Sequence, residues 1–93
     1  MTKSERIHLD KVASLGCIIC LRKGLHTPPQ IHHIRAGQGM GQRASHYETI
    51  PLCYHHHQGE HGIHHMGTRA WEAEHGTERE ILREVLELIL WDK

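Results

Sequence analysis

Cys17-Ile-Ile-Cys20 and Cys53-Tyr-His-His56 stand on either side of the tandem pair His32-His33. Each outer stretch has two metal-binding side chains separated by two residues, which is the spacing of one half of a tetrahedral zinc site. Together they supply three thiolates and one imidazole, a donor set typical of structural zinc. We therefore predict a small domain folded around zinc, with a second histidine-rich centre beside it.

Three adjacent histidines follow Cys53, so the fourth zinc ligand has to be chosen among them. We favour His56, because residues three apart lie on the same side of a helical turn. His55 or His57 can take its place. A zinc site uses all three cysteines of the chain, whereas an odd cysteine count fits a set of disulfides poorly. The alternative is three buried free cysteines.

The composition fits a small domain that needs such a metal. The chain has 93 residues, which we expect to form one domain over 1–93, and it contains no phenylalanine. A core this small and this poor in large rings is marginal. Zinc can offset that weakness, since its binding stabilises small zinc peptides by about 10–16 kcal/mol.

The distribution of apolar and charged residues limits the partners that the chain can have. No stretch approaches the roughly 20 apolar residues of a membrane span, and residues 1–10 contain no apolar signal-peptide core. We therefore expect no membrane partner and a reducing compartment such as the bacterial cytoplasm. Residues 1–57 carry seven basic and three acidic side chains, whereas residues 58–93 carry four basic and eight acidic ones. The basic half contains the tandem histidine, so a polyanion can dock there.

The pattern of apolar and turn residues predicts a β-hairpin between helices, an α+β arrangement. The expected strands are 31–34 and 48–53, joined by a glycine-rich loop at 37–43. The expected helices run from an N-cap at Ser4 to Leu15, from Tyr54 to the glycines at 59 and 62, over 67–75, and for about fifteen residues after the capping box Thr77-x-x-Glu80. The last helix has an apolar stripe that we expect in the core, with a partner surface as the alternative (Ile81, Leu82, Val85, Leu88 and Ile89).

Twelve histidines are more than one zinc ion needs. Three of them fall on expected helix surface or loop, where we expect them to be solvated (His8, His26 and His75). Because a strand alternates its side chains between two faces, His32 and His33 should point in opposite directions. A three-nitrogen site for a divalent ion can then be built from His32, His57 and one of His61, His64 or His65.

Four stretches carry a resemblance to a known family. They are Cys17-Ile-Ile-Cys20, the run from Ile31-His-His-Ile to His46, Glu48-Thr-Ile-Pro-Leu-Cys53, and Trp71-Glu-x-x-x-Gly76-Thr-Glu78. From Arg6 to Leu90 the chain resembles the phage recombination-enhancement proteins of the Ref type, which are RecA-dependent nucleases of the HNH superfamily. The resemblance implies a treble-clef-like ββα-metal fold with flanking N- and C-terminal helices.

The resemblance also implies a role for each residue of the histidine centre. His32 and His57 match metal ligands, and His33 matches the general base, its other nitrogen held by a backbone carbonyl. The last ligand is expected to be His64, which precedes a Met-Gly helix entry, although His61 fits the helical spacing of other HNH nucleases. The implied cofactors are a structural Zn²⁺ and a catalytic Mg²⁺ or another divalent ion.

The implied partners are DNA, single-stranded or bound by RecA, and the RecA filament itself. The resemblance further implies a phage or prophage protein acting inside the bacterial host. Arg35 and Arg43 are candidate phosphate contacts. The chain contains no asparagine, so the middle residue of the HNH pattern is missing. His46 or Glu48 would have to tie down the hairpin loop in its place.

Two other functions compete with the nuclease. A non-catalytic zinc module that binds DNA or a recombination protein would explain Cys17, Cys20, Cys53 and His56 equally well. A histidine-rich metal buffer would bind several ions loosely without cutting DNA. The zinc module does not explain why His32-His33 and the later histidines are grouped beyond the needs of zinc, and the buffer needs no ordered base and is distinguished by counting bound zinc per chain. We favour the metal-dependent endonuclease.

Overall fold

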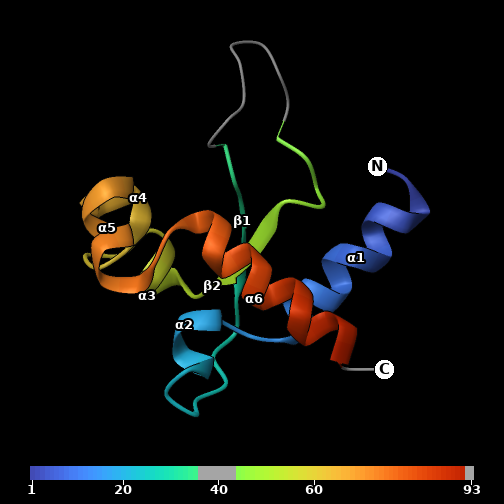
Figure 1. The fold of residues 1–93 in the computed structure, drawn as a ribbon, viewed down its shortest axis with the longest axis horizontal. Coiled ribbons are helices and arrows are strands. Elements are labelled where there is room, and N and C mark those ends of the chain that lie inside the picture. The colour runs from blue at the N-terminus through green and yellow to red at the C-terminus, as the bar shows by residue number, and fades with distance from the viewer. Residues whose placement is uncertain (36–43, 92–93) are drawn as a thin grey trace.

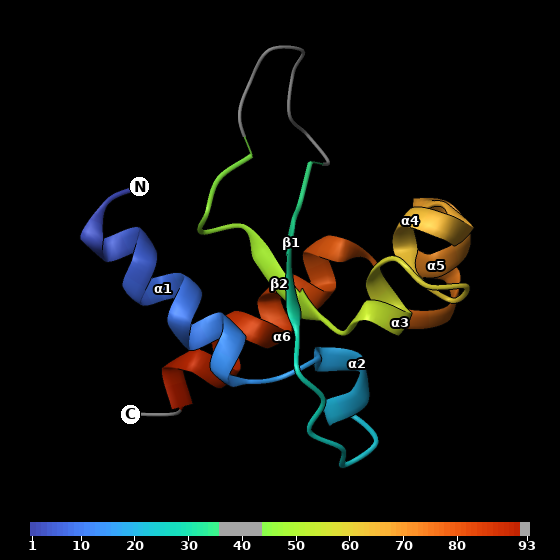
Figure 2. The same ribbon diagram turned by 180° about the vertical axis from the view of Figure 1, so that it is seen from behind.

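A two-stranded antiparallel hairpin runs through the middle of the molecule, with helices on its sides (Figures 1 and 2). The computed structural model describes residues 1–35 and 44–91, so the predicted glycine-rich loop at 37–43 lies outside the described residues. Strand β1 spans Gln30–His33 and strand β2 spans Thr49–Leu52, with His32 opposite Ile50 and Ile31 opposite Pro51. Both predicted strands are confirmed: β1 begins and ends one residue earlier than expected, and β2 is shorter by one residue at each end. Pro51 is tolerated because both strands of so small a sheet are edges.

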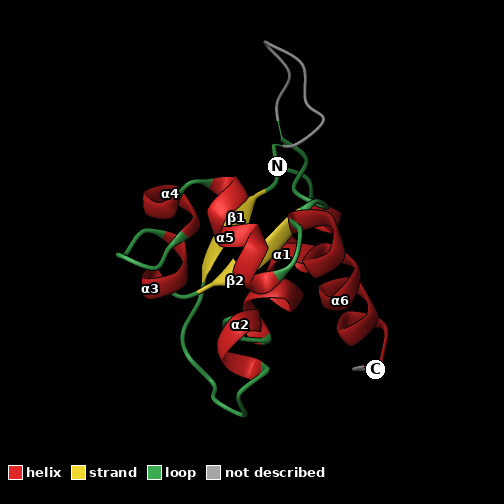
Figure 3. Ribbon diagram, turned by 60° about the vertical axis from the view of Figure 1, so that its left-hand side comes forward, coloured by secondary structure: helices red, strands yellow, loops and turns green. Residues whose placement is uncertain are grey.

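Six helices of the described residues surround the hairpin (Figure 3). Helices α1 (Lys3–Ser14) and α6 (Glu78–Trp91) both pack on β2 and on each other. Helix α3 (Tyr54–His57) contacts both strands, and α4 and α5 follow it at the same end of the molecule (Ile63–Met66 and Thr68–His75). Helix α2 (Ile18–Leu21) contacts β2. The single turns α2 and α4 were not predicted, because four residues are too few to show a helical period.

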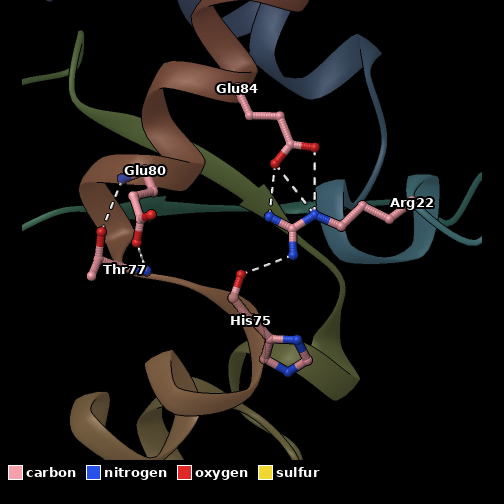
Figure 4. A network of polar contacts seen from close by, with 5 residues as sticks. All are labelled: Arg22, His75, Thr77, Glu80 and Glu84. Atoms are coloured by element: carbon pink, nitrogen blue, oxygen red, sulfur yellow. Dashed lines mark hydrogen bonds and ion pairs between the residues drawn. The ribbon is translucent and has the colours of Figure 1, made fainter.

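The start of α1 differs from the prediction. Thr2, not Ser4, is the N-cap: its hydroxyl accepts from the Glu5 N–H at 3.1 Å, and Glu5 Oε1 accepts from the Thr2 N–H at 2.7 Å. Only Thr2 has an acidic residue three positions later, and that reciprocal pair decides between the two hydroxyls. The predicted capping box of α6 is confirmed, since the Glu80 N–H lies 3.1 Å from Thr77 Oγ1 (Figure 4).

The apolar stripe of α6 lies in the core, as predicted. Ile81 and Val85 are fully buried with Val12 of α1, Ile50 of β2 and Trp71 of α5. Towards its C-terminus the same helix becomes exposed, and the side chain of Trp91 is 86% accessible. The core therefore joins α1, α5 and α6 to the hairpin and fixes the position of both strands.

One arginine ties α2 to the C-terminal part of the chain (Figure 4). Arg22 donates from Nη2 to Glu84 Oε1 at 2.7 Å and from Nη1 to the carbonyl oxygen of His75 at 2.9 Å. Both charged side chains are more than one-third exposed, so the ion pair stabilises the fold by less than about 1 kcal/mol. These contacts link the C-terminal end of α2 to α6 and to the end of α5. Within the described residues, no helix is long and apolar enough to cross a membrane.

Candidate metal centres and the histidine-lined cleft

Cys17, Cys20, Cys53 and His56 form a buried cluster that could bind a metal ion such as zinc. His56 Nδ1 lies 3.6 Å from Cys17 Sγ, 3.8 Å from Cys20 Sγ and 3.2 Å from Cys53 Sγ, and the Sγ atoms of Cys20 and Cys53 are 3.9 Å apart. At ordinary zinc–ligand distances, the edges of a tetrahedral site are about 3.8 Å between sulfurs and about 3.6 Å from sulfur to nitrogen. The donor set therefore fits zinc in chemistry and in size. His56, rather than His55 or His57, completes the cluster.

Local turns bring the two halves of this cluster together. Gly16 has a φ of +74° after α1, and a Cβ there would lie 3.1 Å from the carbonyl oxygen of Thr27, so glycine is required. The Cys17 N–H donates to that same carbonyl at 2.9 Å, which closes the loop. Cys17 is the N-cap of α2, and Cys53 is the N-cap of α3. Each short helix thus begins at one metal-binding thiol and carries the second ligand one turn later.

Burial sets the protonation of this cluster. It raises the pKa of the Cys17 thiol to about 11. Burial, with smaller contributions from the charges of His55 and His75, lowers the pKa of His56 to about 4. A neutral imidazole is the form that binds a metal, whereas the thiol must lose its proton to do so. Metal binding here is therefore coupled to proton release.

Two of the three histidines expected to be solvated are partly buried instead. His75 packs its ring on Trp71 at a centroid distance of 4.7 Å and edge-on to His56 at 5.6 Å. His8 packs against Tyr47 at 5.1 Å, and burial lowers its pKa. The helical surface predicted from the sequence is covered in both cases by another segment of the chain. His26 is exposed, as expected.

A second group of three histidines lies beside the first. His32, His57 and His64 offer ring nitrogens that all lie within 4.8 Å of one another, and they come from β1, α3 and α4. The rings of His32 and His57 meet edge-on at 5.1 Å, and those of His57 and His64 lie 4.6 Å apart. Three convergent imidazoles are a donor set for a divalent transition ion.

His57 is held in the form that a metal needs. Its Nδ1–H donates to Gln30 Oε1 at 2.7 Å, which leaves the lone pair on Nε2. That Nε2 atom lies 3.0 Å from Nε2 of His64. Burial, followed by the charges of His32 and His64, lowers the pKa of His57 to about 4, so the ring is neutral at pH 7. The lone pair of His57 is therefore available at neutral pH.

The two alternative ligands named from the sequence lie elsewhere. His61 places its ring 5.0 Å from that of His55, not beside His57. His65 is the next residue of α4, and it does not belong to the group of converging ring nitrogens; His64, although exposed, does. The short helix α4, which the sequence did not reveal, is what directs His64 rather than His65 towards His57.

The second histidine of the tandem pair has a different partner. His33 Nε2 lies 3.0 Å from Nδ1 of His46, and the rings meet at a centroid distance of 5.1 Å. The partner of this nitrogen is therefore a side chain and not the backbone carbonyl that we expected. His46 is itself held, because its carbonyl oxygen accepts from Thr49 Oγ1 at 3.0 Å. Glu48, the other candidate for tying down the loop, pairs with Arg79 of α6.

Glu78 was missed as a site residue. Its Oε2 atom lies 2.6 Å from Nε2 of His32, and the two residues are only 5% and 7% exposed. Its one sequence signal was its place at the end of the Trp71–Glu78 stretch that carries the family resemblance, and no role was assigned to it there, because Glu78 is one of several acids on a helix that begins with a capping box. The contact joins residues 46 positions apart, which only the fold brings together.

An open cleft of about 620 Å³ joins these groups. It is lined by both tandem histidines, by His57 and His64, and by Arg35 and Glu78, among others. Arg35 is exposed and follows β1, so it can contact a ligand in the cleft. Arg43, the second predicted phosphate contact, lies outside the described residues. The cleft can thus combine three metal-binding nitrogens, one further imidazole and one permanent positive charge.

A small α+β domain with a buried Cys₃His cluster and a histidine-lined cleft is the class of protein that the fold and the site define. A family model described as "Recombination enhancement, RecA-dependent nuclease" matches residues 1–90. The chain belongs to this family, which confirms the resemblance seen in the sequence. The description gives its members a nuclease activity that depends on RecA and a role in recombination. Comparison with curated proteins gave no match.

Proposed function

We propose that the chain is a metal-dependent DNA endonuclease of the HNH type, with residues 1–93 forming one ββα-metal domain. The observation that carries the proposal is the division of the tandem pair. His32 belongs to the three-histidine group, whereas His33 pairs with His46, and both line one cleft. Metal-assisted hydrolysis needs both a metal site and a separate base at the same place.

His33 is the proposed general base. Burial, with the charges of His46, His32 and Arg35, holds its pKa below the ordinary value of histidine, so its ring is neutral at pH 7. With His33 Nε2–H donating to His46 Nδ1, the lone pair lies on Nδ1 and can accept a proton from the attacking water. The bond to His46 then stabilises the positive charge that His33 gains.

His32, His57 and His64 are the proposed ligands of the catalytic ion, Mg²⁺ or another divalent cation. When bound, the ion supplies Lewis-acid stabilisation of the negative charge on the scissile phosphate and on the leaving oxygen. The residues fit a divalent transition ion best, because three imidazole nitrogens converge and the lone pair of His57 is already directed at the group. The Cys₃His cluster holds a structural zinc ion in this proposal.

The proposed substrate is DNA, single-stranded or carried by a RecA filament. Arg35, exposed at the cleft, is the proposed phosphate contact, and Arg43 is a second one. The RecA dependence rests on the family description. We place the protein in the cytoplasm of a bacterial host, encoded by a phage or prophage, and expect 5′-phosphate and 3′-hydroxyl products.

The test is cleavage of circular single-stranded DNA with Mg²⁺ or Mn²⁺, with and without RecA. Wild type is compared with His33→Ala and with His65→Ala, an exposed histidine of α4 that serves as the matched control. We expect wild type and the control to cut only with RecA, and His33→Ala to lose at least about 100-fold in rate. Equal cutting by His33→Ala would refute the base. No cutting by folded, zinc-loaded wild type would favour a non-catalytic zinc module.

A further inference from the structure

We propose that Glu78 is a positioning residue for the catalytic ion: its carboxylate fixes the His32 ring so that the free nitrogen of that ring faces His57 and His64. The inference rests on the proposed function, since it assigns a fourth side chain to the same metal centre. It differs from the ligand set itself, because Glu78 acts on His32 and not on the ion.

The contact between Glu78 and His32 is short and shielded from solvent. Oε2 and Nε2 are 2.6 Å apart, and the side chains of both residues are less than one-tenth exposed. A carboxylate only accepts hydrogen bonds, so the proton lies on Nε2 of His32. The remaining lone pair of His32 is then on Nδ1. The carboxylate thereby selects one tautomer and one orientation of the ring.

A backbone hydrogen bond and the packing of its helix fix the position of Glu78. It begins α6 directly after the Thr77 cap, and its backbone N–H donates to Glu72 Oε2 at 2.7 Å. Ile81 and Val85, further along the same helix, are fully buried, so the helix that carries Glu78 is anchored in the core. A side chain positioned this firmly can restrict the ring that it contacts.

Stability alone does not explain a carboxylate at this place. Removing a charged group from water is costly, and a single hydrogen bond from a neutral imidazole offsets only part of that cost. A metal-ligating histidine, by contrast, usually donates its second N–H to a carboxylate or carbonyl, which orients the ring and raises its basicity. His57 has a comparable partner, because its Nδ1–H donates to Gln30 Oε1. Two of the three proposed ligands therefore have their second ring nitrogen hydrogen-bonded to another side chain.

Glu78 orients one of the proposed ligands but is not itself one of them. The ring nitrogens within 4.8 Å of one another belong to His32, His57 and His64, and the contact of Glu78 with this group is made to Nε2 of His32. Loss of Glu78 should therefore weaken ion binding without removing a ligand.

The test is a calorimetric titration of zinc-loaded protein with Mn²⁺. Wild type is compared with Glu78→Ala, Glu78→Gln and Glu80→Gln; the last is the matched control, because Glu80 is an exposed acid in the same turn of α6. We expect Glu78→Ala to bind Mn²⁺ about 10–100-fold more weakly than wild type. Glu78→Gln should lie between the two, since its amide oxygen still accepts from His32. Glu80→Gln should bind like wild type.

The outcomes distinguish a failure of the positioning role from a failure of the proposed catalytic centre. Unchanged Mn²⁺ affinity in Glu78→Ala overturns the positioning role and leaves the nuclease untouched. A wild type that binds no ion beyond its zinc overturns the catalytic centre and this inference with it. If Glu78→Ala does not fold, the Mn²⁺ affinity of Glu78→Gln is the test. An affinity weaker than that of wild type supports the positioning role, and an equal affinity overturns it. Saturating Mn²⁺ should restore most of the cleavage lost in the folded variant, which a merely structural defect would not allow.

Discussion

His33 Nε2 lies 3.0 Å from His46 Nδ1, so the proposed base, which lines the cleft, is paired with a second imidazole. The two residues are 13 positions apart in the sequence, and the hairpin brings them together. If the chain is of the HNH type, as proposed, His46 would take over the role of the HNH asparagine, a residue type that this chain lacks. An imidazole that accepts a hydrogen bond from the base can do the same work of orientation.

Replacing His46 by alanine should slow cleavage without affecting the zinc cluster. We expect a loss of roughly tenfold in kcat, because His33 keeps its place on β1 but loses the partner that sets its tautomer. His46→Gln should recover part of the rate, since its amide oxygen can accept from His33. The measurement is RecA-dependent cleavage at saturating DNA, with His26→Ala as the exposed control. A His46→Ala rate equal to that of wild type would contradict the pairing.

Removing the zinc should unfold the domain. Cys17→Ser replaces a buried thiol that lies 3.6 Å from His56, and treatment with a strong chelator removes the ion from wild type. Because zinc stabilises small metal-folded peptides by about 10–16 kcal/mol, we expect loss of the helical circular dichroism in both cases. Adding zinc should restore the signal of the chelated wild type only. Helicity that survives chelation would show that the core is sufficient by itself.

Stability should fall as the pH is lowered from about 6.5 towards 4. Burial, followed by the charges of neighbouring histidines, lowers the pKa of His56 and of His57 to about 4. Between the ordinary histidine pKa near 6.5 and that value, the unfolded chain binds protons that the folded chain does not, so the free energy of unfolding decreases with falling pH. Urea titrations at several pH values measure this change. A flat profile over this window would contradict the assigned burial.

The second centre should prefer transition ions to Mg²⁺. Its three donors are imidazole nitrogens, which suit nickel, cobalt and zinc, whereas Mg²⁺ favours oxygen ligands. We expect affinities in the order Mg²⁺, Mn²⁺, Co²⁺, Ni²⁺ from weakest to strongest, with Ni²⁺ at least roughly tenfold above Mg²⁺. His64→Ala should weaken the binding of each ion, and His65→Ala should not. Competition titrations on zinc-loaded protein measure the series.

Local spacing predicted the parts of the site that belong to one turn or one strand. The two cysteine-containing stretches, the tandem histidine and His57 have fixed offsets along the chain, and the structure brings Cys17, Cys20, Cys53 and His56 into one cluster. Contacts between distant segments had no such signal. Glu78 reaches His32 only because α6 packs on β2, and His46 reaches His33 across the hairpin. Spacing alone left His61, His64 and His65 open, and the preference for His64 came from the family resemblance; the position of His64 depends on α4, a single turn that no periodicity could reveal.

Helix α3 gives one ligand to each metal group, because His56 faces the three thiols and the next residue, His57, faces His32 and His64. Successive residues of a helix are turned by about 100° from each other. A single inserted or deleted residue in this turn would therefore break at least one of the two groups. The ligand spacing of the structural centre and that of the proposed catalytic centre therefore cannot vary independently. A chain that gains or loses a residue here has to restore the ligand positions of both centres together.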